Sequence, residues 1–557
     1  MQLLQHFKEL TINPKNTKEL KGLILQLAIQ GKLTANWREK NPNIIPANVL
    51  IKNILKDKER LIKQKKSKQK KQLSNVLEEE IPFELPKSWV WCRLGDITDL
   101  PYGKGLSKKD LTLEGYDVFG ANGIIGKYSS YLYEDEQLLI SCRGAYSGKT
   151  NISPKKCFVT SNSLVCDFFN KDLTYYKYFF YSITALPKNK IVTGSAQPQV
   201  TATNALPLPI ALPPLEEQKE IVKVVETLFK EVELLEQLTV ERINLKEDFV
   251  TSALNQLTTN NANQEWAFLQ EHFKSFFNET ANIKKLRETV LQLAVQGKLT
   301  ADWREKNSYT EDASILLKRI QKEKAQLVKD KKIRKEKTLP KITKEEIPYE
   351  LPDGWIWEYL GISMLKITDG THHSPANVEN GDFKYVSAKN IKSKGIKLSN
   401  ITYVTEEAHR EIYARCNPQL GDLLYIKDGA TTGICCINDL DEEFSMLSSV
   451  ALIKQPKEVL NEYLLRVFRS PYYYDLMRKG MTGVAITRVT LTKLKASIIP
   501  IPPLEEQKVI VQKVNTLMGL CDNLEQEVKR SQEQIVQLMQ SCLREVFEGE
   551  SNVEIKN

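Results

Sequence analysis

Two long stretches of the chain carry apolar or small residues at alternating spacings of four and three, the spacing of a coiled-coil seam. In 504–547 the seam consists of Ile510, Val514, Leu517, Cys521, Leu524, Val528, Ser531, Ile535, Leu538 and Cys542. In 215–257 it consists of Ile221, Val225, Leu228, Val232 and Leu235, before it weakens at Thr239, Arg242 and Lys246. We therefore predict two long helices that pair with each other antiparallel.

Two other regions, roughly 92–205 and 358–496, have a different pattern. Short apolar runs such as QLLISC, KCFVT and SLVCDFF in the first, and FKYVSA, DLLYIK and GICCIN in the second, alternate with glycine-rich turns. This alternation predicts strands joined by loops, with some helix near 175–183 and 459–478. Each region is therefore expected to form a mixed α/β domain.

The chain is an internal repeat. LQLAIQGKLTANWREKN at 25–41 recurs as LQLAVQGKLTADWREKN at 291–307, with 15 of 17 positions identical at an offset of 266 residues (291 minus 25). The same offset relates EEIPFELPKSWVW at 79–91 to EEIPYELPDGWIW at 345–357. PPLEEQK at 213–219 returns at 502–508, where the offset has grown to 289. Each half thus has a near-constant frame around a divergent variable domain.

The variable domains share a sequence skeleton. Ile97-Thr98-Asp99 resembles Ile367-Thr368-Asp369, and the segment from Leu138 to Gly148 resembles that from Leu423 to Gly433. We predict an α+β chain in which two mixed α/β domains are separated by two long antiparallel coiled-coil helices, with a pseudo-twofold repeat. The expected parts are a helical region with a basic run, a first variable domain, a central region, a second variable domain and a distal helix, at 1–78, 79–211, 212–343, 344–500 and 501–557.

Charge and cysteine usage narrow the class of protein. The net charge is +9, but 52–71 alone carries a net +8 and 318–337 a net +7. Such concentrated charge is typical of a surface that meets phosphate, although a solvated helical linker would look the same. Nine cysteines without regular spacing indicate reduced thiols in a cytoplasmic protein. No apolar run approaches the ~20 residues of a membrane helix, so we expect no membrane partner.

The order of the motifs resembles a known family. The LQLAVQGKLTADWR block, a basic helix, the ELPxxW motif, a variable domain that closes on TGSAQPQVT and the PPLEEQ helix follow one another and are then repeated. Over essentially the whole chain this resembles the specificity subunits of type I restriction–modification systems. The second variable domain departs from the pattern, because it closes on TGVAITRVT.

The resemblance implies a sequence-specific subunit that binds double-stranded DNA and reads a bipartite target, one half-site per variable domain. It implies two methyltransferase subunits docked on the conserved regions, and restriction subunits that complete the nuclease. It also implies that this chain binds no cofactor, with S-adenosylmethionine on the methyltransferase and ATP and Mg on the restriction subunit.

Motifs for catalysis are not found. The sequence has no (N/D)PP(Y/F) tetrapeptide, glycine-rich cofactor loop or phosphate-binding GxxxxGK(S/T) motif. His372 and His373 are adjacent, but five histidines in the whole chain suggest no four-ligand metal site. We therefore expect a non-catalytic chain without a metal site. The alternatives are the recognition part of a fused methyltransferase–nuclease, for which the repeats leave no room, and a purely structural coiled-coil scaffold, which would need no variable domains.

Polar residues in the glycine-rich loops are the candidate DNA contacts, because Asn and Gln can pair with adenine and Arg and Lys with guanine. The first domain offers Tyr102, Gly103, Lys104, Asn122, Gly123, Arg143, Gln197 and Gln199. The second offers Thr371, His372, His373, Lys389, Asn390, Lys427 and Arg488. Trp89, Trp91, Trp355 and Trp357 could stack on bases, but as twins in the frame they are expected to anchor each domain to its helix.

Overall fold

The computed structural model describes residues 16–64, 73–187, 191–194, 198–259, 263–307, 311–373, 375–376, 378–479 and 488–548. The chain divides into two compact units, residues 1–243 with 532–557, and residues 244–531. Each unit contains one frame copy and one variable domain, and each is described by itself. Among the described residues no helix is long and apolar enough to cross a membrane.

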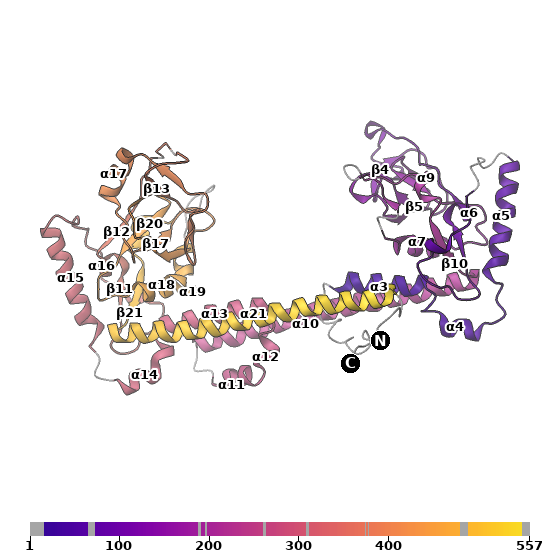
Figure 1. The fold of residues 1–557 in the computed structure, drawn as a ribbon. Coiled ribbons are helices and arrows are strands. Elements are labelled where there is room, and N and C mark those ends of the chain that lie inside the picture. Colours follow the sequence, from indigo (N-terminus) through magenta and orange to yellow (C-terminus); the bar gives the residue numbers. More distant parts are fainter. Residues whose placement is uncertain are drawn as a thin grey trace. The chain divides into compact units, whose positions relative to one another are not determined.

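In the first unit, helices form the frame, and short helices also occur within the variable domain (Figure 1). Its helices are α3 (Thr17–Ile29), α4 (Ala35–Lys40), α5 (Ala47–Lys63), α6 (Leu94–Ile97), α7 (Tyr176–Thr184), α9 (Ala202–Ala205) and the first part of α10 (Leu215–Thr259). Helix α3 ends before Gly31, whose φ of 70° is the left-handed conformation that glycine adopts most easily. The chain enters and leaves the variable domain through β1 (Val90–Arg93) and β10 (Pro209–Leu212), which pair antiparallel.

The first variable domain contains small sheets. A three-stranded sheet has the order β6-β5-β8, and a second has the order β4-β3-β7. Strand β2 pairs with β9. The strands are β2 (Thr98–Asp99), β3 (Tyr116–Phe119), β4 (Ile124–Tyr128), β5 (Leu138–Ser141), β6 (Thr150–Ile152), β7 (Phe158–Val159), β8 (Ser163–Val165) and β9 (Asp167–Phe168). The predicted strands QLLISC, KCFVT and SLVCDFF and the predicted helix near 175–183 are thereby confirmed.

The second unit repeats this plan with more regular strands. A four-stranded sheet has the order β12-β20-β17-β18, and a three-stranded sheet has the order β16-β13-β19. The strands are β11 (Ile356–Tyr359), β12 (Lys366–Asp369), β13 (Phe383–Val386), β14 (Ile391–Lys392), β15 (Gly395–Ile396), β16 (Thr402–Val404), β17 (Leu423–Ile426), β18 (Cys435–Ile437), β19 (Phe444–Met446), β20 (Val450–Lys454) and β21 (Ile498–Ile501). Strands β11 and β21 pair as β1 and β10 do.

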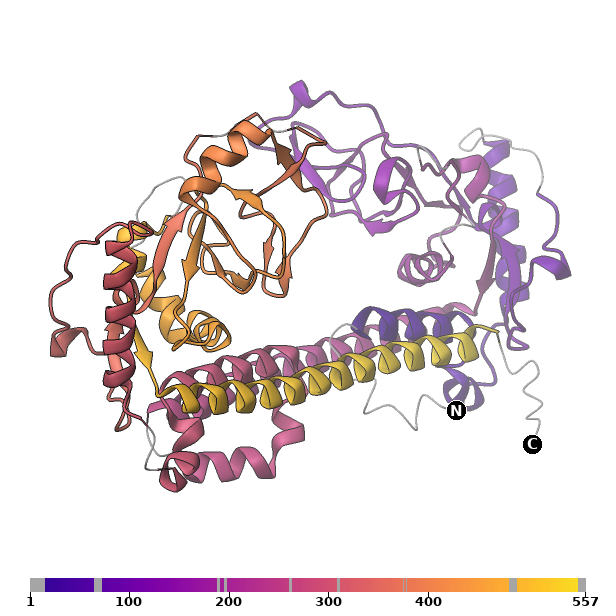
Figure 2. The same cartoon turned by 60° about the vertical axis from the view of Figure 1, so that its left-hand side comes forward.

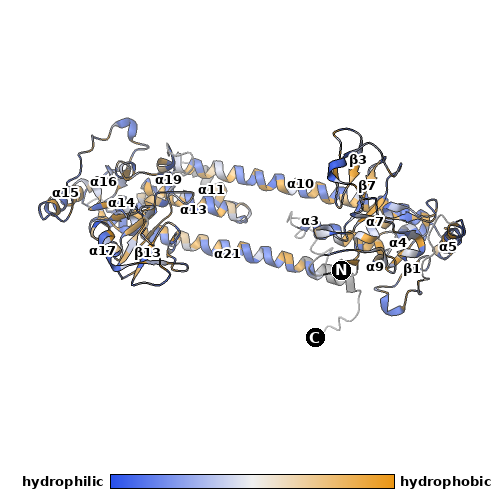
Figure 3. Ribbon diagram, turned by 90° about the horizontal axis from the view of Figure 1, so that it is seen from above, coloured by the Kyte–Doolittle hydropathy of each residue, from blue (hydrophilic) through white to orange (hydrophobic). Residues whose placement is uncertain are grey.

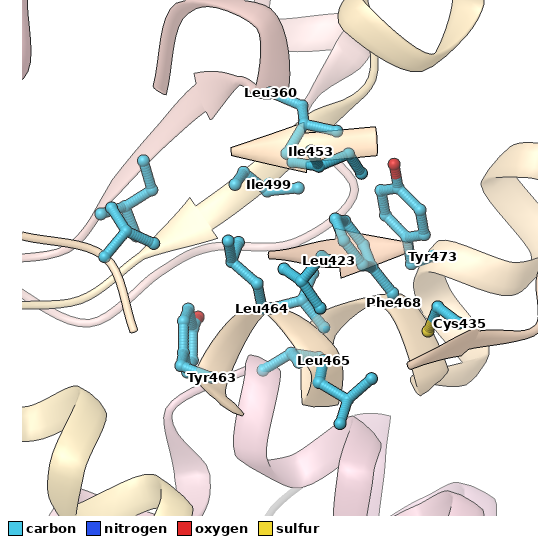
Figure 4. Packing of buried hydrophobic residues seen from close by; sticks show 14 of the residues in the cluster. Leu360, Leu423, Cys435, Ile453, Tyr463, Leu464, Leu465, Phe468, Tyr473 and Ile499 are labelled. Carbon is cyan, nitrogen blue, oxygen red and sulfur yellow. The ribbon is translucent and has the colours of Figure 1, made fainter. Parts of the chain in front are cut away.

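Helices cover the four-stranded sheet of the second unit. The helices of this unit are the last part of α10, α11 (Asn263–Glu271), α12 (Phe273–Phe276), α13 (Thr280–Val295), α14 (Ala301–Lys306), α15 (Ala313–Lys329), α16 (Leu360–Ser363), α17 (Glu406–Arg415), α18 (Asn461–Arg469), α19 (Pro471–Arg478), α20 (Leu491–Lys495) and the first part of α21 (Leu504–Glu548). Leu464 and Phe468 of α18 pack against Leu423 and Ile453 of the sheet (Figure 4). The predicted helix at 459–478 is therefore two helices, which meet at Ser470.

The long helices share one hydrophobic core in the second unit. Val250 and Leu254 of α10 and Cys521 and Val528 of α21 are buried in it together with Leu286 of α13. Apolar residues recur along both long helices, and α13 lies between them (Figure 3). The sequence predicted the packing of the two long helices, and the structure adds α13 as a third member of this core.

Polar contacts of α13 fix the helix directions within this unit. Lys285 contacts Glu247 of α10, and Lys298, beyond the end of α13, donates to the carbonyl of Thr258, so α13 and α10 run parallel. Arg287 contacts Asp522 of α21, whereas Asp302, later in the chain, contacts Lys513, which is earlier in α21. The parts of α10 and α21 in this unit therefore run antiparallel, as predicted (Figure 2).

Candidate DNA-reading edges of the two variable domains

Backbone and side-chain hydrogen bonds gather the loops of the first variable domain at one edge. The Gly103 amide donates to the Ser163 carbonyl at 3.0 Å, and the Ser163 hydroxyl donates to the Gly120 carbonyl at 2.8 Å. The Ser141 hydroxyl donates to the Ala121 carbonyl, and the Gly144 amide donates to the Pro198 carbonyl at 3.2 Å. We call the loops 102–104, 120–123, 143–149 and 198–199 the first edge.

The exposed side chains of the first edge can donate hydrogen bonds and stack. Arg143 and Gln199 lie opposite each other in an antiparallel β-bridge, and both lie at the surface. The Lys149 ammonium lies 5.9 Å from the centre of the Tyr146 ring, which is itself exposed. Tyr102 is 45% exposed and Lys104 is exposed beside it. Burial raises the pKa of the Cys142 thiol, so this neighbour of Arg143 stays an uncharged core residue.

The second variable domain forms a corresponding second edge from the loops 369–373, 387–390, 427–433 and 488. The Ser448 amide donates to the Thr371 carbonyl at 2.9 Å, and the Ala388 amide donates to the Ser449 hydroxyl at 3.3 Å. The Val489 amide donates to the Lys427 carbonyl at 2.8 Å. These bonds bring Thr371, His372, His373, Lys389, Asn390, Lys427 and Arg488, all sequence candidates, to one edge.

A chain of ion pairs runs along the second edge. Arg415 lies 2.5 Å from Asp369, and the ammonium of Lys427 lies 3.4 Å from the same carboxylate and 3.5 Å from that of Asp428. Asp428 in turn contacts Arg488 at 3.1 Å. The two arginine side chains at the ends are 52% and 56% exposed. Each guanidinium is thus held at one side by a carboxylate that is itself largely shielded from solvent, which orients its remaining N–H groups.

Two candidates of the second edge are buried and serve the fold. Lys427 is 3% exposed and is neutralised by Asp369 and Asp428. Asn390 is 6% exposed, and its side-chain carbonyl accepts from the Ser387 amide at 3.0 Å while its amide donates to the Lys397 carbonyl at 3.2 Å. Because their polar atoms are already bound inside the domain, we remove both from the candidate DNA contacts. They position the exposed residues beside them.

Strand register shows that the two edges are equivalent. Lys104 bridges to Thr160 just as Thr371 bridges to Leu447, in parallel. Arg143 bridges to Gln199 just as Asp428 bridges to Arg488, antiparallel. Strands β3 and β13 carry the same pairing with β7 and β19, which places the loop of Asn122 and Gly123 at the position of Lys389 and Asn390. Several candidates chosen separately in each domain therefore occupy matching positions: Lys104 and Thr371, Gln199 and Arg488, and residues 122–123 and 389–390.

The shared Ile-Thr-Asp triplets are an exception, and their predicted equivalence is wrong. In the second domain, Asp369 pairs with Ala451 of β20. The residue of the first domain that corresponds to Ala451 is Leu164 of β8, and Leu164 lies opposite Tyr102, not opposite Asp99. Tyr102, three residues after Asp99, therefore stands where the second domain has Asp369. Sequence similarity over three residues was too short to detect this shift in register.

Glycine is required where each edge approaches its neighbouring strand. A Cβ atom on Gly103 would lie 2.3 Å from the Val159 carbonyl oxygen, and one on Gly370 would lie 1.8 Å from the Met446 carbonyl oxygen. Both distances are far below van der Waals contact. Gly103 was among the predicted site residues. Sequence reasoning missed Gly370, Asp369, Asp428 and Tyr146 of the edges, and Arg415 of α17, which contacts Asp369 of the second edge. Gln197 lies outside the described residues.

The adjacent histidines His372 and His373 lie on the second edge. His372 approaches Asp369 at 3.4 Å, and this carboxylate already contacts Arg415 and Lys427. Among the described residues no group of three potential ligands is arranged to hold a metal ion. Both histidines are exposed on the second edge.

The frame holds each variable domain through one buried carboxylate. Glu217, at the start of α10, accepts from the Trp89 indole at 2.8 Å, the Thr34 hydroxyl at 2.7 Å and Arg38 at 2.5 Å. The second copy repeats these contacts, with Glu506 bound by the Trp355 indole, Thr300 and Arg304. This confirms Trp89 and Trp355 as anchors between domain and helix. The ion pair between this buried carboxylate and an arginine accounts for the presence of the second glutamate in each PPLEEQ motif and of the arginine in each WR motif.

The first basic run is helical as far as Lys63 in α5, and the second as far as Lys329 in α15, beyond which residues 330–337 form no helix. In α5, Lys58 donates to the Gly95 carbonyl at 2.7 Å, and in α15 its counterpart Lys324 donates to the Gly361 carbonyl at 2.6 Å. These two lysines support the start of the variable domains, whereas Lys52, Lys56 and Lys63 are exposed. The strongly basic end of the first run, 65–71, lies outside the described residues.

Comparison with known proteins decides the family. The family model of the type I restriction modification DNA specificity domain matches residues 86–245 and 367–534, one copy in each unit. The chain belongs to this family. It is a specificity subunit of a type I restriction–modification system, the non-catalytic subunit with the DNA target-recognition role.

Curated relatives match this specificity subunit almost from end to end. The specificity subunits of the type I restriction enzymes EcoAI and EcoEI of Escherichia coli are 28% and 26% identical to it, and each match covers 93% of this chain and 91% of the relative. A solved HsdS subunit from Thermoanaerobacter tengcongensis is 17% identical, with a TM-score of 0.40 over 85% of this chain and all of the other.

Proposed function

We propose that this specificity subunit reads a bipartite double-stranded DNA target, with each edge reading one half-site. The observation that carries the proposal is that equivalent backbone positions of the two edges have different side chains. Where the first edge has Tyr102, Arg143 and Gln199, the second has Asp369, Asp428 and Arg488. One scaffold that presents two sets of hydrogen-bonding groups is suited to reading two different sequences.

The chemistry of each edge fits contacts to base edges and phosphates. Arg143 is a candidate for guanine, which an arginine can bind through two acceptors, and Gln199 is a candidate for adenine. In the second domain, Arg415 and Arg488 are held by carboxylates and can direct their free N–H groups outward. Tyr146 and Tyr102 supply aromatic surface. Most protein–DNA hydrogen bonds go to phosphate and sugar, so only part of each set is expected to read bases.

The repeated frame supports the proposed partners. Because the frame is present twice, each surface of the frame is present twice. Two methyltransferase subunits could therefore bind, one to each copy of the frame. S-adenosylmethionine would then be bound by those subunits, and ATP and Mg by restriction subunits that join the complex. The exposed lysines of α5, Lys52, Lys56 and Lys63, would add affinity for DNA phosphates without reading sequence.

An exchange of variable domains tests the proposal. The antiparallel pair β1 and β10, in which Arg93 faces Pro209, is the point where the chain enters and leaves the first domain. Residues 94–208 should therefore be replaced by the corresponding domain of another specificity subunit, and residues 360–497 in a second chimaera of the same kind. With methyltransferase subunits added, methylated adenines are mapped in DNA. The first exchange should change one half-site and the second exchange the other.

Two results would contradict the proposal. If one exchange changes both half-sites, the domains do not read independently. If the chain methylates DNA with S-adenosylmethionine before methyltransferase is added, the catalytic group lies in this chain. An exchange that abolishes methylation is checked by assembly with the methyltransferase, which a correctly folded frame should retain.

A further inference from the structure

The two repeats differ at a point just after equivalent helices. Helices α7 and α18 correspond, because the Tyr178 hydroxyl donates to the Ala211 carbonyl at 2.7 Å and the Tyr463 hydroxyl donates to the Pro500 carbonyl at 2.9 Å. The position three residues beyond the end of each helix has a different residue in the two repeats. This residue is Pro187 in the first repeat and Tyr472 in the second.

In the second repeat, Tyr472 fills the space between the frame and the variable domain. Its ring lies 5.5 Å from Trp357 and 5.6 Å from Tyr349, centre to centre. Its hydroxyl donates to the Ile498 carbonyl at 2.9 Å, and its amide donates to Gln292 at 3.0 Å. The Trp357 indole donates to the Tyr349 carbonyl, so the polar groups of this aromatic cluster are bound.

In the first repeat the corresponding space is a cavity of about 410 Å³. Phe83 and Trp91, the counterparts of Tyr349 and Trp357, line it with their rings 5.2 Å apart. Gln26 and Pro209, the counterparts of Gln292 and Ile498, also line it. Pro187, which lines the cavity, is exposed and has no aromatic ring or hydroxyl to place there. The buried Trp91 indole N–H has no hydrogen-bond partner among the described residues, unlike that of Trp357.

We propose that this cavity of the first repeat binds a phenol, in the position that Tyr472 occupies in the second repeat. The ring would lie against Phe83 and Trp91, and its hydroxyl would donate to the Pro209 carbonyl. The unpartnered Trp91 N–H supplies a donor to an acceptor on the ligand. Most of the cavity wall is apolar, and its polar side chains are Gln26, Gln30, Glu79, Glu80, Ser182 and Asn204. Mainly apolar pockets with a small number of polar groups are the usual binding sites of small aromatic molecules. The source of the phenol is a free small molecule or a tyrosine side chain of a partner protein.

The first experiment titrates the full-length specificity subunit with p-cresol, the side chain of tyrosine as a free molecule. We expect one equivalent to bind by calorimetry, more tightly than toluene, which lacks the hydroxyl. The tryptophan fluorescence change on binding should disappear in Trp91→Phe. In Tyr472→Ala, which opens the equivalent space, two equivalents should bind.

Pro187→Tyr is the closing variant, because it restores the residue of the second repeat and should abolish binding to the natural cavity. In the double variant with Tyr472→Ala, one equivalent should bind again, which also shows that the closed protein is folded. The proposal is overturned if the natural protein binds no p-cresol, or if Pro187→Tyr binds it as before.

A last measurement separates the two sources of the phenol, and it alone rests on the proposed function. The methyltransferase subunit is titrated into the natural protein with and without saturating p-cresol. If p-cresol weakens assembly, and Pro187→Tyr does so too, the ring comes from that partner. If assembly is unchanged while p-cresol binds, the site takes a free phenol.

Discussion

Replacing Glu217 by Gln should weaken the attachment of the first variable domain to the start of α10. The Glu217 side chain is fully buried and accepts from Thr34, Arg38 and Trp89. Glutamine has the same shape, but it loses the charge that balances Arg38, and its NH₂ group must face either the Trp89 indole or the two other donors. Neither orientation satisfies all of the buried groups.

The expected loss of stability follows from these contacts. Removing one partner of a buried ion pair costs about 3–5 kcal/mol, because the other charge is left without compensation. The Arg38 side chain is 19% exposed and can turn partly toward water, so we expect the lower end, about 3 kcal/mol. At about 1.4 kcal/mol for each factor of ten, local opening should become roughly a hundredfold more frequent.

Hydrogen–deuterium exchange measures this opening in the first unit. Peptides that contain α4 and β1 should exchange roughly a hundredfold faster in Glu217→Gln, in proportion to the free energy lost. The neighbouring Glu216 lies nearer the surface, so Glu216→Gln removes the same charge from the same helix turn and serves as the control. Equal exchange in the two variants would refute the role assigned to the buried carboxylate. Glu506→Gln, with Glu505→Gln as control, repeats the test in the second unit.

Further predictions concern the edges and the long helices. The Gly103→Ala variant should lose recognition of the first half-site, because its Cβ would lie 2.3 Å from the Val159 carbonyl oxygen. In the control Gly105→Ala the new Cβ meets nothing within 4 Å, so this variant should recognise both half-sites. Mapping of methylated adenines tests this, and equal activity of the two variants would contradict it. A heptad inserted after Leu235 and another after Leu524 keeps both seams in phase and lengthens each helix by about 10.5 Å. The preferred gap between half-sites should then grow by about three base pairs in a binding selection, and an unchanged gap would show that other elements set the spacing. Changing the exposed lysines of α5 to Gln should reduce the salt dependence of DNA binding without changing the DNA sequence that is recognised. An unaltered salt dependence would exclude contacts between these lysines and DNA phosphates. These lysines are Lys52, Lys56 and Lys63.

Local patterns of the sequence determined the helices, many strands and the repeat. Helices α10 and α21 follow from apolar spacing that depends on neighbours within a few turns, and β5 and β17 follow from short apolar runs between glycines. The offsets of 266 and 289 residues separated frame from variable domain, because frame positions must keep the same contacts in both copies. The role of Trp89 and Trp355 as anchors could also be expected from their place in the frame.

Long-range pairing decided what local patterns could not. The Ile-Thr-Asp triplets look equivalent in sequence, but the ladder places Tyr102 opposite Leu164, three residues from the expected register. Asn390 and Lys427 have the residue types of DNA contacts, and only their packing shows that their polar atoms are bound inside the domain. The cavity beside Trp91 exists because Tyr472 has no counterpart in the first repeat. Periodicity along the chain determines which face of an element is apolar, but the partners of that face come from distant segments, and only the tertiary structure brings them together.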